Sequence, residues 1–144
     1  MSVVITLHDD VPEVEGRFVD TGLGEANDAA APLHEVRRLS PFARADDGDV
    51  IGGAVGRTWG ACCELQQLWV ATTQRRHGIA ARLVREFERR ARERGCSTFY
   101  LETFSFQAPG LYRALGYEVA HEIRGFAPDI VKYLMVKNLG VPDA

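Results

Sequence analysis

The stretch QRRHGIAARL, residues 74–83, changes from a basic, glycine-containing segment into an amphipathic helix. The N-terminus of a helix has backbone N–H groups without partners inside the helix and carries partial positive charge. Arg75, Arg76 and His77 oppose that dipole, and Gly78 in the first turn costs up to about 1 kcal/mol relative to alanine. Two local rules are broken at one place, which is typical of a functional site. The stretch therefore predicts a loop that binds a phosphate or diphosphate.

The residue types in this loop leave room for an anion, because Gly78 permits close approach and Ala80 keeps the next position small. Other phosphate-binding loops fit less well. A Walker motif requires Gly-Lys-Ser or Gly-Lys-Thr, which does not occur, and a GxGxxG loop after a buried parallel strand is also absent from the sequence.

The strongest predicted helix spans residues 77–94. Its apolar residues recur at spacings of three and four, and arginines and glutamates occupy the other face: the apolar set is Ile79, Leu83, Val84, Phe87 and Ala91. Gly95 follows where a left-handed helix terminator belongs. With strands expected at 61–70 and 97–104, the helix forms a βαβ unit whose two strands run parallel.

The remaining segments predict mostly antiparallel strands. A β-branched strand is expected at 2–7, a weak helix within 8–34, and two strands within 36–59 around the turn formers DDGD at 46–49. A short helix starts at Pro109, and two closing strands, YEVAHEIR and YLMVKNL, are joined by GFAPDI. The predicted fold class is mixed α/β (α+β), in one domain that spans residues 1–144.

Composition excludes several classes of protein. The 144 residues are 46% hydrophobic and 26% charged, and the net charge of −3 provides no field toward nucleic acid or an anionic membrane. No secretory leader is recognisable and no apolar run approaches the ~20 residues of a membrane span, so we expect a cytoplasmic protein. The three cysteines fit neither a disulfide framework nor a metal site, and we expect them to be small buried residues: Cys62, Cys63 and Cys96.

Two motifs in order resemble the GNAT superfamily of acyl-CoA-dependent N-acetyltransferases. RRHGIA, residues 75–80, resembles the R/Q-x-x-G-x-G/A motif of that family. APGLYRALGYE, residues 108–118, resembles its second signature, a short helix with a Leu-Tyr pair that ends in Gly-Phe or Gly-Tyr. The resemblance covers residues 50–138 and implies the GNAT fold, in which strands 61–70 and 97–104 splay apart beside the βαβ unit.

The resemblance implies acetyl-CoA as co-substrate and no metal. The loop would hold the pyrophosphate of coenzyme A through backbone amides, and the cofactor-binding residues would be Arg75, Arg76, His77, Gly78, Ile79 and Ala80. Main-chain groups of Leu68, Trp69 and Val70 would pair with the pantetheine arm. Many members have an asparagine seven residues before the signature tyrosine that contacts the cofactor, and this chain has Ser105 there.

The same resemblance places Tyr112 close to the cofactor sulfur, as general acid to the leaving thiolate. Glu64 matches a strand glutamate that serves as general base in one branch of the family, and alternation places it on the same face as Gln66 and Leu68. Glu102 and Phe104 lie near the splay and are assigned to the acceptor site. The base is left open among Glu64, Glu102 and water, and Tyr112 has the alternative of filling the core.

The leading hypothesis is transfer of an acetyl group to a primary amine of a small molecule or peptide, by direct attack in a ternary complex. A module that binds acyl-CoA without turnover is the alternative from another class. Use of another acyl group or of a hydroxyl acceptor is a further alternative. The acceptor carries no readable motif, and dimerisation, common in such folds, is not required by the sequence.

Overall fold

The computed structural model describes residues 1–140, and its contacts divide the chain into two compact units. The first unit is Met1–His34, and the second begins at Glu35. Each unit is described by itself, and the expectation of a single domain stays a prediction.

The first unit contains helix α1, Glu13–Ala30. Glu13 and Glu15 lie in its first turn, where negative charge complements the helix dipole. The strand predicted at 2–7 is wrong, because these residues are exposed and form neither a strand nor a helix. A β-branched run forms a strand only where another strand supplies hydrogen-bond partners.

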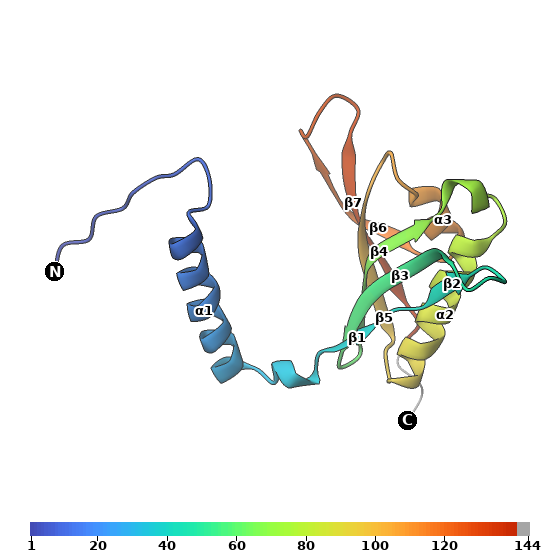
Figure 1. Cartoon of the computed structure of the whole chain (residues 1–144), viewed down its shortest axis with the longest axis horizontal. Coiled ribbons are helices and arrows are strands. Elements are labelled where there is room, and N and C mark those ends of the chain that lie inside the picture. The colour runs from blue at the N-terminus through green and yellow to red at the C-terminus, as the bar shows by residue number, and fades with distance from the viewer. Residues whose placement is uncertain (141–144) are drawn as a thin grey trace. The chain divides into compact units, whose positions relative to one another are not determined.

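The second unit is built on one mixed sheet with the strand order β1-β3-β4-β5-β7-β6 (Figure 1). The short strand β2 also pairs with β3. The strands are β1 Arg37–Leu39, β2 Phe42–Arg44, β3 Val50–Trp59, β4 Cys62–Val70, β5 Thr98–Phe104, β6 Glu118–Arg124 and β7 Val131–Asn138. Among the strand pairs within residues 1–140, only β4 and β5 run parallel. The predicted mixed, mostly antiparallel fold with a parallel βαβ unit is confirmed.

The turn at 46–49 joins β2 to β3, as its residue types predict. Asp47 accepts a hydrogen bond from the N–H of Asp49 at 2.9 Å, and Gly48 has a φ of 93°. The strand expected before this turn is divided into β1 and β2 around Pro41, whose carbonyl accepts a hydrogen bond from Ala54 N–H at 3.0 Å.

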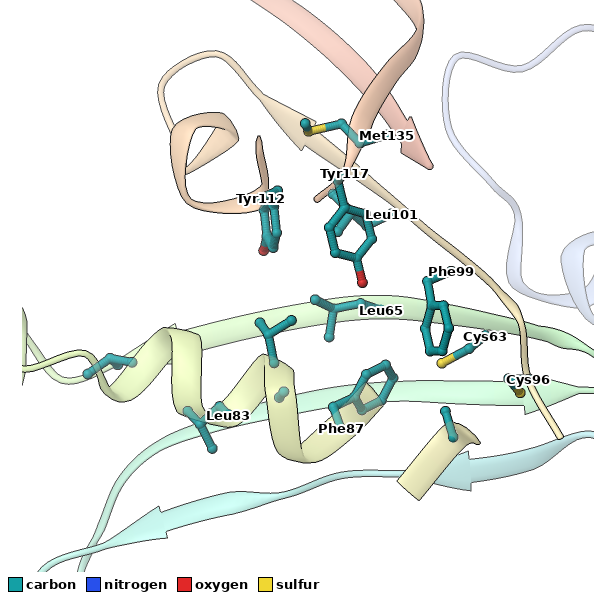
Figure 2. Packing of buried hydrophobic residues seen from close by; sticks show 14 residues of the cluster. Cys63, Leu65, Leu83, Phe87, Cys96, Phe99, Leu101, Tyr112, Tyr117 and Met135 are labelled. Carbon is teal, nitrogen blue, oxygen red and sulfur yellow. The ribbon is translucent and has the colours of Figure 1, made fainter. Parts of the chain in front are cut away.

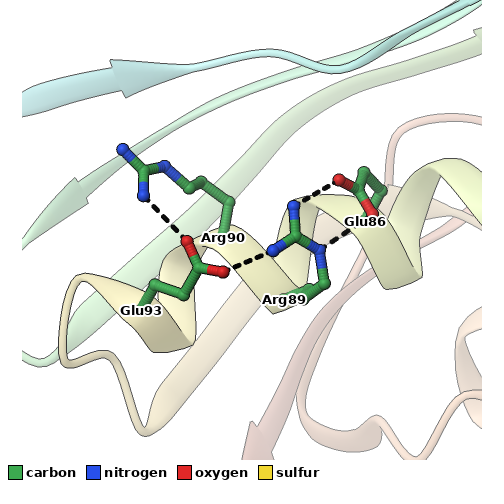
Figure 3. Close-up of polar contacts among 4 residues, drawn as sticks. All are labelled: Glu86, Arg89, Arg90 and Glu93. Carbon is green, nitrogen blue, oxygen red and sulfur yellow. Dashed lines mark hydrogen bonds and ion pairs between the residues drawn. The ribbon is translucent and has the colours of Figure 1, made fainter.

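Helix α2, Ile79–Glu93, packs its apolar stripe on β3 and β4. Leu83, Val84, Phe87 and Ala91 are buried, and Figure 2 shows Leu83 and Phe87 on the helix side facing the strands. The opposite face carries ion pairs in which Arg89 joins Glu86 and Glu93 (Figure 3). Gly95, with a φ of 95°, ends the helix as predicted.

The sheet and α2 approach closely because Gly56 on β3 has no side chain. A Cβ there would lie 2.1 Å from the carbonyl oxygen of Glu64 and 2.5 Å from Cζ of Phe87. Neither distance is possible between real atoms, so this contact requires glycine.

A β-bulge interrupts β4. Val55 pairs with Gln67, but the next residue of β3, Gly56, pairs with Leu65, so Gln66 is an extra residue without a partner on β3. Such a bulge bends a strand and increases its twist. The C-terminal half of β4 therefore departs from the direction set by its first half.

The bulge also changes which residues of β4 face the core. Before it, Cys63 and Leu65 are buried, and after it Leu68 and Val70 pack on the core. Glu64 consequently lies on the opposite face from Leu68. The expectation that these two share a face is wrong, because strict alternation holds only for a strand without a bulge.

The parallel ladder between β4 and β5 is short. It runs from Cys62 opposite Thr98 to Leu65 opposite Leu101, and residues 66–70 form no pairs with β5. The two strands therefore separate beyond Leu65, as the family resemblance implies.

Helix α3, Pro109–Ala114, follows β5, and the chain between α3 and β6 adds a buried polar contact. Glu88 of α2 is buried, accepts a hydrogen bond from the hydroxyl of Tyr117 at 2.7 Å, and pairs with Lys137 at 2.9 Å. The charges of Glu88 and Lys137 thus compensate each other inside the unit.

The cysteines are free, and Cys63 and Cys96 are buried as expected. Cys62 is exposed, so its predicted burial is wrong, because its side chain alternates to the outer face of β4. Among residues 1–140, no helix combines the length and apolar character needed to cross a bilayer.

Candidate active site

Two clefts lie at the separation of β4 and β5. The large cleft has a volume of about 610 Å³. It is lined by Leu68, Trp69, Val70, Gln74, Arg75, Arg76, Gly78, Ile79, Ala80, Ala81, Phe106, Gln107, Ala108 and Leu111. The small cleft, of about 310 Å³, is lined by Glu64, Leu65, Gln66, Glu102, Thr103, Phe104, Gln107 and Lys132. Gln107 is the residue that these two linings share.

The start of α2 presents backbone donors to the large cleft. Within the part of the chain that the structure describes, the N–H groups of residues 76–81 form no hydrogen bond to the backbone, and no side chain caps the helix. Arg76 and Gly78 both have positive φ, 68° and 73°. A run of free N–H groups at the positive end of a helix dipole favours an anion.

The requirement for glycine at position 78 is conformational in this structure. A Cβ on Gly78 would meet no atom of the chain within 4 Å, but its φ of 73° lies in the left-handed region. The open space above Gly78 is part of the large cleft, so a side chain there would project into it.

The basic residues of the loop are placed differently from one another. Arg75 and Arg76 both line the large cleft. Arg75 also donates a hydrogen bond from Nε to the carbonyl oxygen of Val70 at 3.1 Å, which ties the loop to the end of β4. His77 is exposed and is not part of the cleft lining.

The edge of β4 supplies one wall of the large cleft. Leu68, Trp69 and Val70 lie beyond the last pair with β5, and Trp69 is exposed. Their backbone groups on the β5 side consequently have no strand to pair with. An extended ligand can pair with such an edge in the same way as an added strand.

Tyr112 of α3 is buried and lies outside the linings of both clefts, although its chain neighbour Leu111 lines the large cleft. The ring of Tyr112 packs edge-on against Tyr117, with 5.9 Å between the centroids (Figure 2). Burial raises the pKa of Tyr112 to about 12. Its phenol is therefore protonated at neutral pH and holds its proton more strongly than a tyrosine in water.

Both carboxylates of the small cleft are paired with cations. Glu64 accepts a hydrogen bond from Nε of Arg57 at 2.9 Å, and Glu102 pairs with Lys132 at 2.8 Å. The ammonium of Lys132 also lies 5.6 Å from the centroid of the Phe104 ring. The structure thus brings Glu64, Glu102 and Phe104 to one cleft, with positive charge beside each carboxylate.

Ser105 lies outside both clefts. Its hydroxyl donates to the carbonyl of Asp129 at 3.4 Å and accepts from the N–H of Val131 at 3.0 Å. The side chain therefore fixes the start of β7 to the end of β5, and the structure does not bring it together with the other predicted cofactor residues.

Gln107 and the packing of Phe126 against Phe104 were not singled out from the sequence. Phe104 stacks on Phe106 at 5.3 Å and meets Phe126 edge-on at 5.3 Å. Phe126 comes from the segment between β6 and β7, which carried no motif. Gln107 reaches both clefts through a tight turn, which has no spacing signal in the sequence.

The family model described as acetyltransferase (GNAT) family matches residues 11–117, which include β4, the loop, α2, β5 and α3. The chain belongs to the GNAT acetyltransferase family. The predicted resemblance is confirmed.

The individual relatives of this GNAT chain are also named as acetyltransferases. The chain is 38% identical to blasticidin-S acetyltransferase of Streptomyces morookaense over 112 residues. The matched region covers 75% of this chain and 82% of the relative. An acetyltransferase from Bacillus cereus has a TM-score of 0.78 at 23% identity, covering 93% of this chain and 98% of that chain. A Bacillus anthracis protein assigned as a streptothricin acetyltransferase, crystallised with acetyl coenzyme A, has a TM-score of 0.61 at 19% identity, covering 70% and 62%. These two structures share the fold.

Proposed function

We propose that this protein transfers an acetyl group from acetyl-CoA to a primary amine, by direct attack in a ternary complex. One observation carries the proposal. A single cleft connects the free N–H groups at the start of α2 with the open edge of β4, and it reaches α3 at Leu111, the chain neighbour of Tyr112. A diphosphate, an extended amide chain and a thioester have matching positions along it.

The residues of the large cleft fit coenzyme A. N–H groups of 76–81 and the positive charges of Arg75 and Arg76 suit the diphosphate. The unpaired edge at 68–70 suits the amides of the pantetheine arm. A structural neighbour with the same fold was crystallised with acetyl coenzyme A, which supports this assignment.

The amine would approach from the small cleft, so that it meets the thioester at the separation of β4 and β5. An alkyl ammonium must lose a proton before it attacks, because its reference pKa is near 10.4. Glu64 and Glu102 line this cleft, and either can accept that proton directly or through water. Glu64 pairs with Arg57, and Glu102 pairs with Lys132.

Attack forms the C–N bond and places negative charge on the former carbonyl oxygen. A backbone N–H near Val70 is assigned to that oxygen. When the C–S bond breaks, Tyr112 is assigned to donate its phenolic proton to the thiolate. The products are the amide and the free thiol of coenzyme A.

The acceptor we favour is a small-molecule amine. The relative from Streptomyces morookaense is a blasticidin-S acetyltransferase, and at 38% identity it supports a similar class of acceptor. Blasticidin S therefore belongs in the first panel of acceptors, beside simple alkyl amines, an N-terminal peptide amine and a hydroxyl compound.

The test is release of free thiol from acetyl-CoA over that panel, with acetylated product identified by mass spectrometry. We expect thiol release that depends on one amine and equals the amide formed. Glu64→Gln and Glu102→Gln variants separate the candidate bases, since the true base variant loses turnover with unchanged affinity for coenzyme A. Binding of acetyl-CoA without thiol release for every acceptor would favour the non-catalytic module, and release with the hydroxyl compound alone would favour an O-acyltransferase.

A further inference from the structure

We propose that Gln107 is a catalytic residue, whose side-chain amide donates a hydrogen bond to the carbonyl oxygen of the acetyl group as negative charge develops there. The inference rests on the proposed function and adds a named side-chain donor to it. Its basis is position, since Gln107 lines both the large and the small cleft.

The orientation of the Gln107 amide is fixed by two donors. Its Oε1 accepts the backbone N–H of Phe104 at 2.8 Å and the hydroxyl of Thr103 at 3.3 Å. The first bond identifies the atom, because a backbone N–H only donates and its partner must be the amide oxygen. The turn adds a further constraint, since the N–H of Gln107 donates to the carbonyl of Phe104 at 2.9 Å.

These bonds also locate the side chain at the separation of the strands. The N–H of Ser105 donates to the carbonyl of Val131 next to β7. Neighbouring residues of a strand direct their N–H groups to opposite sides, so the N–H of Phe104 points away from β7, toward the β4 side. Gln107 therefore fills the position on β5 where β4 would continue if the strands had not separated.

The Nε2 group of Gln107 is left to donate hydrogen bonds. With Oε1 occupied, Nε2 holds two N–H groups, and within residues 1–140 it has no hydrogen-bond partner. An attacking amine must keep its lone pair free for the carbonyl carbon, so it is an unsuitable partner for a donor. The thioester oxygen is the group at this junction that gains negative charge, and a donor held in place by other bonds stabilises such charge.

The step is balanced without proton transfer at Gln107. The amine nitrogen bonds to the carbonyl carbon, the electron pair of the C=O bond moves onto oxygen, and Nε2–H shortens its hydrogen bond to that oxygen. When the pair returns, the C–S bond breaks, the thiolate takes a proton from Tyr112, and the amine proton leaves to the base.

The decisive variant is Gln107→Glu, which is nearly isosteric. A carboxylate keeps both acceptor bonds, to Phe104 N–H and Thr103, but has no proton to donate at neutral pH. We expect kcat with acetyl-CoA and the identified amine to fall on the order of 10²-fold, as for loss of one oxyanion donor, with the KM for acetyl-CoA and the melting temperature close to wild type. Gln67→Glu, exposed on β4 and outside both clefts, adds the same charge nearby and should leave kcat unchanged.

A second readout separates donation from a structural role. As pH falls toward the ordinary Glu pKa of about 4.3, the side chain of Gln107→Glu gains a proton and becomes a donor, so its deficit relative to wild type should shrink. Gln107→Leu removes both functions, and its deficit should stay constant over the same pH range.

The outcomes are distinguishable. Wild-type kcat in Gln107→Glu together with impaired Gln107→Leu would overturn the inference and leave Gln107 as a structural cap of β5. A Gln107→Glu defect confined to KM would overturn it as well, because it would show equal binding of ground and transition states. If the wild-type protein neither binds coenzyme A nor releases thiol, the proposed function itself is wrong.

Discussion

Arg75 donates a hydrogen bond from Nε to the carbonyl oxygen of Val70 at 3.1 Å. The bond joins the loop before α2 to the last residue of β4, and both segments line the large cleft. Arg75 therefore contributes position as well as charge. Its directed Nε–H fixes the distance between the proposed diphosphate site and the proposed pantetheine edge.

Replacement of Arg75 separates these two contributions. Arg75→Lys keeps the charge but cannot reproduce the planar Nε–H donor, and Arg75→Met loses both. We expect the Kd for coenzyme A, measured by calorimetry, to rise about 3-fold in the first variant and 10-fold or more in the second. Arg90→Met, on the exposed face of α2, is the control and should bind as wild type. Equal binding by Arg75→Lys and wild type would reduce the role of Arg75 to charge.

Loss of the Tyr112 hydroxyl tests its role as an acid. Tyr112→Phe should lower kcat by about 10²-fold with unchanged affinity for coenzyme A, because the ring still fills its place beside Tyr117. Steady-state kinetics and calorimetry on the same preparation measure the two quantities. Full activity of this variant would mean that Tyr112 only fills the core.

The pH dependence of stability follows from buried acids. Burial raises the pKa of the Cys63 thiol from 9.0 to about 12 and that of Tyr112 from 10.0 to about 12. The unfolded chain releases these protons at the ordinary values while the folded chain holds them. The contribution of these two groups to the free energy of unfolding is thus fully present below pH 9 and is lost as pH rises toward 12.

Urea unfolding between pH 8 and 11 measures this decline. Tyr112→Phe should reduce the slope above pH 10, where a shift of about two units is worth roughly 2–3 kcal/mol when complete. Between pH 8 and 9 its slope should equal that of wild type. A flat free energy of unfolding up to pH 11 in the wild-type protein would contradict the burial of both groups.

Gly56→Ala tests the close contact of α2 with the sheet. The new Cβ would lie 2.1 Å from the Glu64 carbonyl, so β3 and β4 must move apart. We expect a loss of about 1–3 kcal/mol or more in the free energy of unfolding. Gly110→Ala in α3 is the control, because a Cβ there meets no atom within 4 Å and alanine favours helix. Similar stability of the two variants would be incompatible with the described packing.

The parts predictable from sequence were those with a repeating or conformational signal. The 3.6-residue period predicted α2, and Gly95 predicted its end. The helix was expected to start at residue 77 with Gly78 in its first turn, but it starts at Ile79, and Gly78 is the residue before it with a positive φ. The bulge at Gln66 could not be predicted, because one extra residue in a strand changes neither the composition nor a turn signal. It places Leu68 on the opposite face of β4 from Glu64.

The ion pairs between neighbouring strands could not be predicted either. Glu64 meets Arg57 across two strands and Glu102 meets Lys132 across two others, so the local sequence around each carboxylate does not contain its partner. The prediction of a strand at residues 2–7 was wrong because it rested on local preference alone. The β-branched residues there favour a strand, but no other strand within residues 1–140 pairs with them.

The central claim is that free N–H groups around Gly78 bind the diphosphate of coenzyme A, and calorimetric titration with coenzyme A tests it most directly. Gly78→Glu adds a carboxylate to the cleft, and Gly95→Glu is its matched control at the other end of α2, with a similar positive φ and equally open surroundings. We predict binding by the wild-type protein and by Gly95→Glu, and loss of binding by Gly78→Glu. Equal affinity of all three proteins, or no heat of binding with wild type, would contradict the claim.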